Sequence, residues 1–494
     1  MKKRSMLFDI FNVALSNFIV ILSGVAIGFL VPKIMEVEEY GFYKTFTLYI
    51  SYAGFFELGV VEGIYLIIAG KMKEELNKEK MRLVFRLLIF IEVIIASIFL
   101  FVAFTFLDRT YCIIFASLGI NIIFVNIIQY FQFVSQAIQR FKEYSIINII
   151  KSVVTIGLVA LLYVLYLTET LTEVKFYYII ALTVGVNALV SLLYIFLYRD
   201  YNFGHAIKMS EDKKFVKKIF AYGIPLLISN LVCSLLLTID RQFVSILFTK
   251  EEYGIYAFAY NMIALITTAT SAISAVLFPI MVKAKYEDIE TEYPYLSSLV
   301  LMFVYGCLFA YFPLYLIVQY FLPKYFDSLV IFRIIFPALV AQSVISIVMQ
   351  NHFKKINANM IYFYCSLIIL ALSIVGSIIA YAIFKSQAAI SIASVIVSFL
   401  WYFIMEFYFV KRFKVKWIRN GIFLLSMAAV FYLSTMIPNI YISGAVYLVS
   451  FAAMSFAFYY KNIFKFLHAY FGKHPKEEKN EESNELEEKV EVAD

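Results

Sequence analysis

The chain has 494 residues, of which 63% are hydrophobic and 16% are charged, against soluble-domain averages of about 45 to 50% and about 25%. This composition excludes an ordinary soluble enzyme and indicates a chain that lies in a lipid bilayer. The formal net charge is +7, but residues 475–494 carry nine acidic side chains and three lysines. We expect an acidic cytoplasmic tail, 465–494, to be disordered, because such a segment cannot bury enough apolar surface to fold.

Long apolar runs predict about fourteen transmembrane helices, so the expected fold class is an all-α integral membrane protein. Six predicted helices precede a polar loop and cover residues 7–31, 41–69, 83–107, 111–138, 146–166 and 176–198. Eight follow the loop and cover residues 219–248, 255–282, 296–322, 325–350, 359–384, 386–410, 420–437 and 440–464.

Lysine and arginine are distributed unevenly between the two sides of these helices. Of the 42 residues of these types, 33 lie at the termini or in connections on the N-terminal side, and seven lie in connections on the opposite side. The positive-inside rule therefore predicts that both termini are cytoplasmic. Because this topology explains the basic loops, they do not indicate a nucleic-acid partner.

One short phrase returns at a spacing of 213 residues. Residues 38–43 read Glu-Glu-Tyr-Gly-Phe-Tyr and residues 251–256 read Glu-Glu-Tyr-Gly-Ile-Tyr, and the same spacing relates a Ser-Asn pair at 16–17 to another at 229–230. Six helices separate the copies, so both halves point the same way, as in parallel-repeat transporters with a substrate site between the halves. We expect an N-lobe at 1–198, a cytoplasmic loop at 199–218, a C-lobe at 219–410 and two extra helices at 411–464.

The Ser-Asn pairs, the repeated Tyr-Gly-x-Tyr phrase, the Leu-Thr-Ile-Asp-Arg stretch at 237–241 and the two six-helix halves resemble the multidrug/oligosaccharidyl-lipid/polysaccharide exporter superfamily. Within it, the chain is similar to the Wzx-type flippases of polysaccharide and O-antigen oligosaccharides. The resemblance implies a bacterial plasma-membrane flippase that moves an undecaprenyl-pyrophosphate-linked oligosaccharide from the inner to the outer leaflet by alternating access, for surface polysaccharide biosynthesis. It also implies the lipid-linked glycan and glycan-assembly proteins as partners.

Charged side chains inside membrane spans are costly, so each one is a candidate for function. Arg241 and Arg333 both lie roughly 11 to 12 Å from the outer ends of their predicted helices, and two guanidinium groups at one depth suit a pyrophosphate. The resemblance also implies a cavity-facing cation at position 241. Lys44 is a third candidate cation. In the alternative interpretation, Asp240 neutralises Arg241, and the other two cations extend toward the membrane surface.

Three acidic residues are candidates for coupling transport to a proton or sodium gradient, namely Glu57, Glu62 and Asp240. A carboxyl group in a low-dielectric cavity can exchange a proton or bind a cation as its environment changes. If 41–69 is one continuous helix, five positions turn it by about 140°, so Glu57 and Glu62 cannot share one narrow face. The alternative interpretation is a salt bridge to an arginine of a lobe.

Neutral polar residues supply candidate sugar ligands. Gln129, Gln132 and Gln136 recur on one face of a predicted helix, and Asn230 belongs to the repeated Ser-Asn pair. Amides can bind sugar hydroxyls, although hydrogen bonds between helices are the more common use of such residues. Two small-residue motifs, starting at Gly24 and Gly59 and each ending four residues later, predict only close contacts between helices.

The sequence contains no further chemical motif. The four cysteines and four histidines are scattered, so we expect no disulfide framework, metal site or cofactor. Without a phosphate-binding loop or a hydrolase motif, the protein is expected not to be an enzyme and not to use ATP. Three alternatives stay open: an ion-coupled multidrug exporter, a peptidoglycan-precursor flippase and an integral-membrane polysaccharide polymerase.

Overall fold

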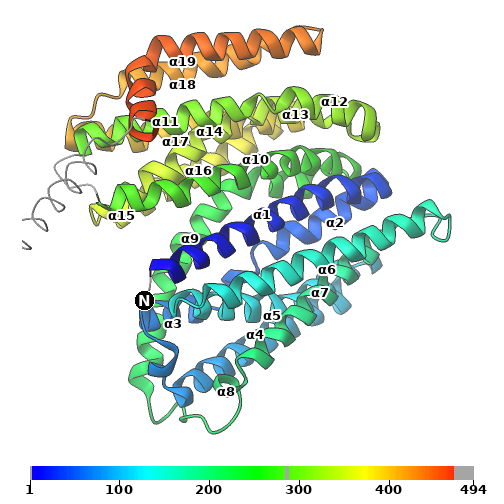
Figure 1. Ribbon diagram of the computed structural model, residues 1–494. Helices are drawn as coiled ribbons and strands as arrows, with labels where there is room; N and C mark the ends of the chain where they lie inside the picture. The colour runs from blue at the N-terminus through cyan, green and yellow to red at the C-terminus, as the bar shows by residue number, and fades with distance from the viewer. Residues whose placement is uncertain (1–2, 284–288, 472–494) are drawn as a thin grey trace, which may run out of the picture. The chain divides into compact units, whose positions relative to one another are not determined.

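The computed structural model describes the backbone of residues 3–283 and 289–471, and the side chains of residues 19–267 and 289–462. Within these ranges the chain is helical and contains no strand (Figure 1), which confirms the all-α class.

The elements before residue 284 are α1 (Lys3–Ile34), α2 (Val37–Ile50), η1 (Ala53–Phe55), α3 (Val60–Ile68), η2 (Lys73–Glu75), α4 (Lys78–Phe106), α5 (Arg109–Ala137), α6 (Phe141–Leu167), α7 (Phe176–Leu197), α8 (Arg199–Asn202), α9 (Lys213–Leu247) and α10 (Lys250–Lys283). The elements after residue 288 are α11 (Ile289–Leu308), α12 (Tyr311–Phe321), η4 (Pro323–Tyr325), α13 (Ser328–Ile335), α14 (Ala338–Val344), η5 (Ile345–Met349), α15 (Gln350–Lys355), α16 (Asn359–Phe384), α17 (Gln387–Phe413), α18 (Ile418–Ser434) and α19 (Ile440–Phe471).

The described helices make this chain a multi-pass membrane protein. Nine of them are long and apolar enough to cross a bilayer, and the number rises to eleven when two bent pairs are each counted as one span. Every predicted span falls on one helix or on a bent run of helices, although the total of fourteen stays a prediction. Helix α19 continues to Phe471, past the predicted start of the tail at 465, and the rest of the tail lies outside the described residues.

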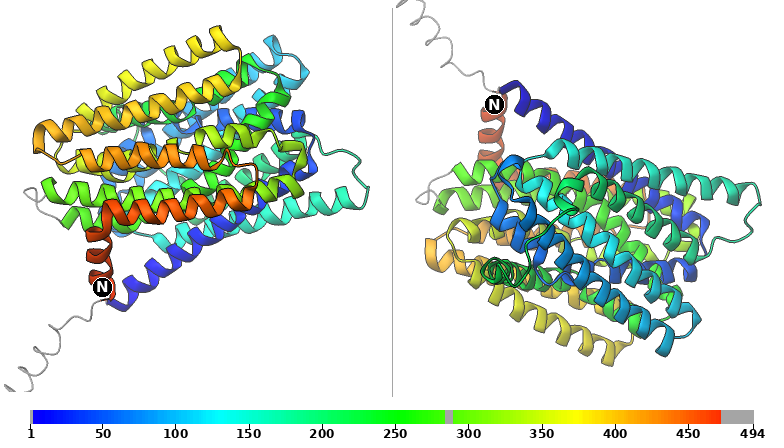
Figure 2. Two further views of the ribbon diagram at one scale, coloured as in Figure 1. Left: turned by 90° about the horizontal axis from the view of Figure 1, so that it is seen from above. Right: turned by 90° about the horizontal axis from the view of Figure 1, so that it is seen from below.

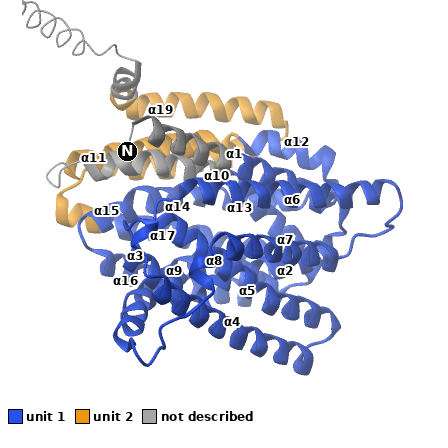
Figure 3. Cartoon of the chain, turned by 60° about the horizontal axis from the view of Figure 1, so that its bottom comes forward, with its two compact units in different colours: residues 1–283, 310–407 blue, residues 284–309, 408–494 orange. Residues whose placement is uncertain are grey.

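The chain divides into two compact units (Figure 3). Unit 1 comprises Met1–Lys283 and Ala310–Phe407, and unit 2 comprises Ala284–Phe309 and Tyr408–Asp494. In unit 2, Tyr305 of α11 donates a hydrogen bond to the Leu424 carbonyl oxygen of α18 (2.5 Å), and Tyr447 of α19 donates to the Tyr305 carbonyl oxygen (2.6 Å). The two extra C-terminal helices therefore share a unit with α11, which the sequence assigns to the C-lobe. The lobe boundaries themselves stay a prediction.

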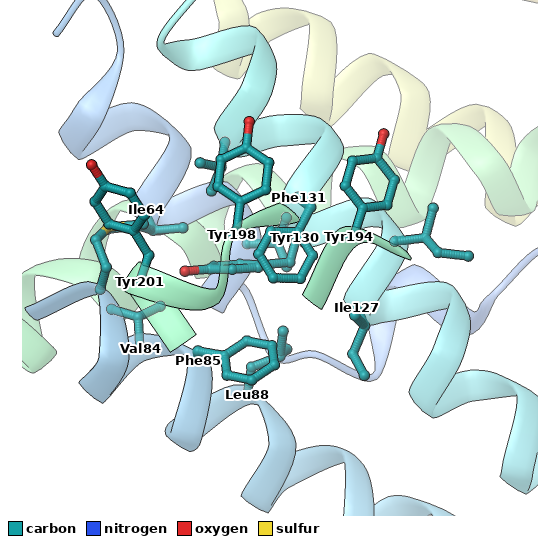
Figure 4. Packing of buried hydrophobic residues seen from close by; sticks show 14 of the residues in the cluster. Ile64, Val84, Phe85, Leu88, Ile127, Tyr130, Phe131, Tyr194, Tyr198 and Tyr201 are labelled. Carbon is teal, nitrogen blue, oxygen red and sulfur yellow. The ribbon is translucent and has the colours of Figure 1, made fainter. Parts of the chain in front are cut away.

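Aromatic side chains fill the core of unit 1 among α3, α4, α5 and α7 (Figure 4). Phe131 of α5 stacks on Tyr194 and Tyr198 of α7, with ring centroids 5.6 and 5.2 Å apart, and Phe85 of α4 lies 5.6 Å from Phe131. Such ring pairs add about 0.5 to 1.5 kcal/mol each beyond the burial of their area. On another side of the unit, α1 runs beside α6 (Figures 1 and 2).

The 213-residue repeat is visible in the ends of the helices. Helix α1 ends at Ile34 and α9 ends at Leu247, while α2 begins at Val37 and α10 begins at Lys250. Both pairs of positions are 213 residues apart. The two copies of the repeated phrase thus occupy equivalent places, at the start of α2 and at the start of α10.

The glycines of the repeated phrase bring these two equivalent helices into backbone contact. A Cβ added to Gly41 would lie 1.9 Å from the carbonyl oxygen of Lys250, and one added to Gly254 would lie 2.3 Å from the carbonyl oxygen of Val37. Each glycine thus meets the first residue of the other helix. Reciprocal contacts of this kind are typical of a two-fold axis. At this crossing, equivalent segments of the two copies of the repeat are therefore in contact.

The second predicted span, 41–69, is a bent run of helices and not one continuous helix. Helix α2 with η1 bends by 49° relative to α3. At the bend, Leu58 and Gly59 adopt left-handed φ values of 57° and 85°, which end a right-handed helix. The Ala53 carbonyl oxygen accepts from the Phe56 N–H (3.1 Å) and also from the amide of Asn126 (2.9 Å), which ties η1 to α5.

Below the break, α3 crosses α9 at a second glycine contact. A Cβ added to Gly63 would lie 2.2 Å from the Ile219 carbonyl oxygen, and one added to Gly223 would lie 1.7 Å from the Gly59 carbonyl oxygen. The close contact predicted for the motif that starts at Gly59 is therefore present. The backbones of the two halves of the repeat are in contact at two crossings, α2–α10 and α3–α9. Side chains of α2, α9 and α10 line a cavity near these crossings.

We predict that Gly254→Ala destabilises the protein, although alanine is the better helix former by about 1 kcal/mol. Its methyl group would collide with the backbone of α2 at Val37, and overpacking of this kind costs about 1 to 3 kcal/mol. The melting temperature of the detergent-purified protein measures the effect. The control is Gly157→Ala on α6, where nothing lies within 4 Å of an added Cβ. If Gly254→Ala melts at the same temperature as Gly157→Ala or the wild-type protein, or at a higher one, the close contact between α2 and α10 is contradicted.

Candidate functional site

A cavity of about 370 Å³ lies within unit 1, between α2, α9 and α10. Helix α2 belongs to the first copy of the repeat, and α9 and α10 belong to the second, so the cavity lies where a parallel repeat is expected to hold its substrate. Its lining combines apolar surface with hydroxyl, amide and cationic groups. The lining residues are Lys44, Thr47, Leu48, Ser51, Ser234, Leu237, Thr238, Arg241, Tyr253, Ala257, Tyr260, Asn261 and Ala264.

Arg241 of α9 is held on the wall of this cavity. One guanidinium nitrogen donates to the Leu237 carbonyl oxygen at 2.7 Å, and the guanidinium carbon lies 4.5 Å from the centroid of the Tyr260 ring. The Nε atom is buried and has no hydrogen-bond partner. A cation over an aromatic face is stabilised by the ring quadrupole without being neutralised, so the guanidinium group keeps its charge and a free donor.

Asp240 does not neutralise Arg241. Its carboxylate accepts hydrogen bonds from the Arg241 backbone N–H (2.8 Å), from Tyr256 Oη (3.0 Å) and from Tyr260 Oη, and among the described residues it forms no salt bridge. Three donors satisfy the buried carboxylate. Asp240 therefore positions the tyrosine ring on which Arg241 rests, and the ion pair of the alternative interpretation is absent.

Lys44 of α2 is the second cation of the cavity. Its Nζ atom lies 3.4 Å from Asn261 Oδ1 and over the rings of Tyr40 and Tyr43, at 5.1 and 5.7 Å from their centroids. Lys44 and Arg241 both line the cavity, and no carboxylate of the described residues lies within salt-bridge distance of either. Two unneutralised cations, one from each half of the repeat, thus face one cavity.

The structure separates Arg333 from this cavity. Arg333 lies on α13, half-buried and near Tyr311, and it is not among the lining residues. Equal depth in the membrane therefore does not bring Arg241 and Arg333 together. The partner of Arg241 at the cavity is Lys44, which belongs to the opposite half.

The candidate amides also lie away from this cavity. Gln132 donates to Asn148 Oδ1 at 3.0 Å, and Gln129 fills the space beside Gly54, 2.7 Å from the position of an added Cβ. Gln136 is half-buried on α5 and Asn230 is exposed on α9, and neither lines the cavity.

The sequence did not identify most polar side chains of the site, among them Tyr256, Tyr260 and Asn261 of α10. Tyr256 belongs to the repeated phrase, and the other two follow it by about one helical turn in an otherwise apolar span. Polar residues about one helical turn apart in an apolar span indicate a polar helix face, and this pattern could have identified them.

Glu57 and Glu62 lie together at the break between α2 and α3. Both are buried, at 0% and 3% exposure, and their side chains lie within hydrogen-bonding range of each other. Glu57 accepts from the Val61 backbone N–H at 2.6 Å, while Glu57 Oε1 and Glu62 Oε2 have no donor among the described groups. The expectation that they cannot share a face is wrong, because left-handed residues interrupt the helix between them. Neither residue lines the cavity of Arg241.

A family model described as "Polysaccharide biosynthesis protein" matches residues 8–285, which is more than half of the chain. The chain belongs to this family. The match spans the first half of the repeat together with α9 and α10, and so it contains every residue that lines the cavity. No curated protein matches the sequence.

Solved structures show the same fold at low sequence identity. The lipid II flippase MurJ, in an inward closed conformation, matches with a TM-score of 0.66 at 15% identity, over 92% of this chain and 100% of that one. An inward-facing multidrug resistance MATE family transporter of the MOP superfamily matches with a TM-score of 0.59 at 16% identity, over 81% and 94%. A MOP superfamily transporter from Pyrococcus furiosus, described with a binding pocket of reversed polarity, matches with a TM-score of 0.55 at 15% identity, over 82% and 95%. The expected exporter-superfamily fold is confirmed.

We predict that Asp240→Asn lowers the melting temperature and that adding Arg241→Gln does not restore it. Asparagine would weaken the hydrogen bonds to the two tyrosines, and hydrogen bonds to charged groups contribute about 1.5 to 3 kcal/mol. The double variant should therefore remain less stable than the wild-type protein. Restoration of stability in the double variant would instead indicate an ion pair. Asp327→Asn, at an exposed aspartate without a side-chain cap hydrogen bond, is the matched control.

Proposed function

We propose that this protein is a flippase that moves a polyprenyl-diphosphate-linked oligosaccharide from the inner to the outer leaflet of a bacterial plasma membrane, for surface polysaccharide synthesis. One observation carries the proposal. Lys44 and Arg241 come from the two halves of the repeat and face one cavity, and neither forms a salt bridge with a carboxylate of the described residues. Two uncompensated cations at membrane depth require an anion, and a diphosphate supplies charge and acceptors for both.

The chemistry of the two cations fits a diphosphate. A guanidinium group offers a planar fork of donors that binds phosphate oxygens in pairs, and an ammonium group offers a point charge. The remaining polar groups of the cavity are hydroxyls and an amide, including Ser51, Thr238 and Asn261. These groups exchange hydrogen bonds with sugar hydroxyls without selecting for charge.

The alternatives differ in the charge that the cavity should carry. An exporter of cationic drugs needs acidic groups free to face the substrate, whereas the three donors to Asp240 already satisfy this carboxylate. A peptidoglycan-precursor flippase shares the diphosphate and the fold, and the likeness to the lipid II flippase MurJ favours it as the second candidate. A polysaccharide polymerase would be an enzyme, and the family match and the transporter fold favour transport instead.

We further propose that Glu57 and Glu62 couple transport to an ion gradient. Two carboxylates facing each other in a buried site repel strongly, and a proton or a cation between them relieves the repulsion. The pair lies beside the α3–α9 glycine crossing, where Gly59 and Gly223 bring the two halves into contact. A change in the charge of the pair therefore affects the contact between the two halves, which must separate there during alternating access.

We predict that Arg241→Gln lowers the affinity for the polyprenyl-diphosphate glycan by at least tenfold, since a desolvated charge pair contributes about 2 to 5 kcal/mol. Arg241→Lys should restore only part of the affinity, because it supplies a point charge and not a fork. Binding to purified protein and flipping in vesicles measure both steps. Arg333→Gln, at a span arginine outside the cavity, is the control. If Arg333→Gln impairs binding and Arg241→Gln does not, the cavity is misassigned.

We predict that Glu57→Gln or Glu62→Gln lowers gradient-driven flipping by about tenfold or more, while binding of the lipid-linked glycan stays unchanged. Glutamine keeps the shape of the side chain but cannot exchange a proton, and a tenfold change corresponds to about 1.4 kcal/mol. Glu92→Gln is the control, because Glu92 is equally buried but its carboxylate accepts a hydrogen bond from Asn126 (2.8 Å). Normal flipping by both single variants across acidic and neutral pH would exclude the pair as the coupling group.

A further inference from the structure

A cavity of about 980 Å³ lies within unit 2, where α11, α18 and α19 meet the end of α17 (α11 and α19 are labelled in Figure 3). It shares no lining residue with the cavity of Arg241. Three of its lining residues are basic, namely Lys414, Lys416 and Arg419, and one is acidic, Glu290. The other lining residues are uncharged. We call this cavity the basic pocket.

The three cations of the basic pocket have no acidic partner in the described part of the chain. All three side chains are exposed, and none forms a salt bridge with a carboxylate of the described residues, Glu290 included. The Arg419 guanidinium carbon lies 5.1 Å from the centroid of the Tyr459 ring, which stabilises the charge without neutralising it. Residues 418 and 419 also begin α18, and a helix N-terminus carries a partial positive charge. The basic pocket therefore attracts an anion.

The last helix leads the chain away from the wall of this pocket. Helix α19 contributes Phe458 and Asn462 to the lining, and its backbone is kinked at Tyr459, where φ is −132°. Tyr459 Oη donates to Asn420 Oδ1 (2.8 Å), and Asn462 Nδ2 donates to Ser298 Oγ (2.8 Å). These hydrogen bonds hold this part of α19 against α18 and α11. The C-terminal part of the chain is therefore tethered at the pocket itself.

The acidic segment 475–494 has the charge and the length to occupy the pocket. Its nine acidic side chains and three lysines give it a net charge of −6, and it begins 13 residues after Asn462. Helix α19 continues for nine residues beyond Asn462, which is a rise of about 14 Å. The 20 residues of the segment span up to about 66 Å when extended, so the segment is long enough to return to the pocket.

We propose that the basic pocket binds the acidic segment 475–494 of the same chain, with carboxylates of the segment paired to Lys414, Lys416 and Arg419. A single exposed ion pair is weak, but the tether gives the segment an effective concentration in the millimolar range, and several pairs form together. An anionic lipid headgroup is the competing occupant, and it lacks the tether. The pocket thus accepts other anions only when the segment leaves it. This inference does not depend on the proposed function.

Disulfide cross-linking in the full-length protein tests the docking. Ser483→Cys, in the acidic segment, is combined with Ile422→Cys on the pocket wall or with Tyr460→Cys, which is exposed on α19 but outside the pocket lining. We expect the pair with Ile422→Cys to form its disulfide at least about fivefold faster than the pair with Tyr460→Cys, because docking raises the local concentration of the segment. Salt at about 1 M should remove most of this advantage, because it shortens the screening length to about 3 Å. Ser483→Cys alone controls for links to the four native cysteines.

Matched charge reversals separate the pocket from the net charge of the protein. Lys414→Glu with Lys416→Glu changes two lysines of the pocket, and Lys411→Glu with Lys461→Glu makes the same change in charge at two exposed lysines outside its lining. Only the first pair should slow the cross-link to Ile422→Cys, by about threefold or more, since nearby charges act most strongly. Replacing the nine acidic side chains of the segment by the corresponding amides should slow it equally. This last variant leaves the described helices unchanged, so it tests the docking even if a pocket variant does not fold.

The competing occupant is tested by measuring the cross-link in nanodiscs of phosphatidylcholine and in nanodiscs of phosphatidylglycerol. Faster cross-linking to Ile422→Cys in both lipids, slowed by the pocket reversals and not by the control reversals, supports the proposal. Equal rates for Ile422→Cys and Tyr460→Cys, or equal effects of the two reversals, would overturn it. Loss of the advantage in phosphatidylglycerol alone would assign the pocket to lipid headgroups, and that result would overturn it as well.

Discussion

The site depends on two positive charges that no acid of the described residues neutralises. Lys44 and Arg241 approach one cavity from opposite halves of the repeat, supported by aromatic rings and not by carboxylates. Cation–π contacts stabilise a desolvated charge by about 2 kcal/mol or more, which is less than burial of the charge costs. We therefore propose that an anion completes the cavity and that, in contact with both charges, it links the two halves through the substrate.

The backbone crossings set the space that this anion enters. Gly41 and Gly254 let α2 and α10 touch at one crossing, and Gly59 and Gly223 let α3 and α9 touch at the other. A single methyl group at either crossing would push the halves apart. The break between α2 and α3 directs the chain from one crossing to the other, and it also places Glu57 beside Glu62. One bent span, α2 with η1 and α3, therefore contributes to the proposed substrate site, to the carboxyl pair and to both contacts between the halves.

Much of the fold could be predicted from the sequence because apolar length and the repeated phrase report directly on helices in a bilayer. The 213-residue spacing reappears in the ends of the helices, and the charge at position 241 faces a cavity as expected. Depth alone did not identify the partner of Arg241, because the direction of a side chain depends on helix rotation, which packing sets. For the same reason, Lys44 lines the site and Arg333 does not.

The remaining differences come from local backbone and from unpaired groups. Hydropathy does not detect a break such as the one at Leu58 and Gly59, since both residues fit an apolar span. Gly63 packs closely against α9, whereas nothing lies within 4 Å of a Cβ added to Gly24, so the close contact predicted at Gly24 is wrong. The two glycines look alike in the sequence. The sequence also does not show that the buried hydroxyl of Tyr40 lacks a hydrogen-bond partner among the described groups.

A double-mutant cycle on Lys44 and Arg241 tests most directly whether the two charges hold one anion. The affinity for polyprenyl diphosphate is measured for the wild-type protein, Lys44→Met, Arg241→Gln and the double variant. If both cations bind the same diphosphate, the double variant loses less than the sum of the single losses, with a coupling of about 1 kcal/mol or more. Losses that add to within about 0.5 kcal/mol would show that the two charges act independently and would contradict the shared site.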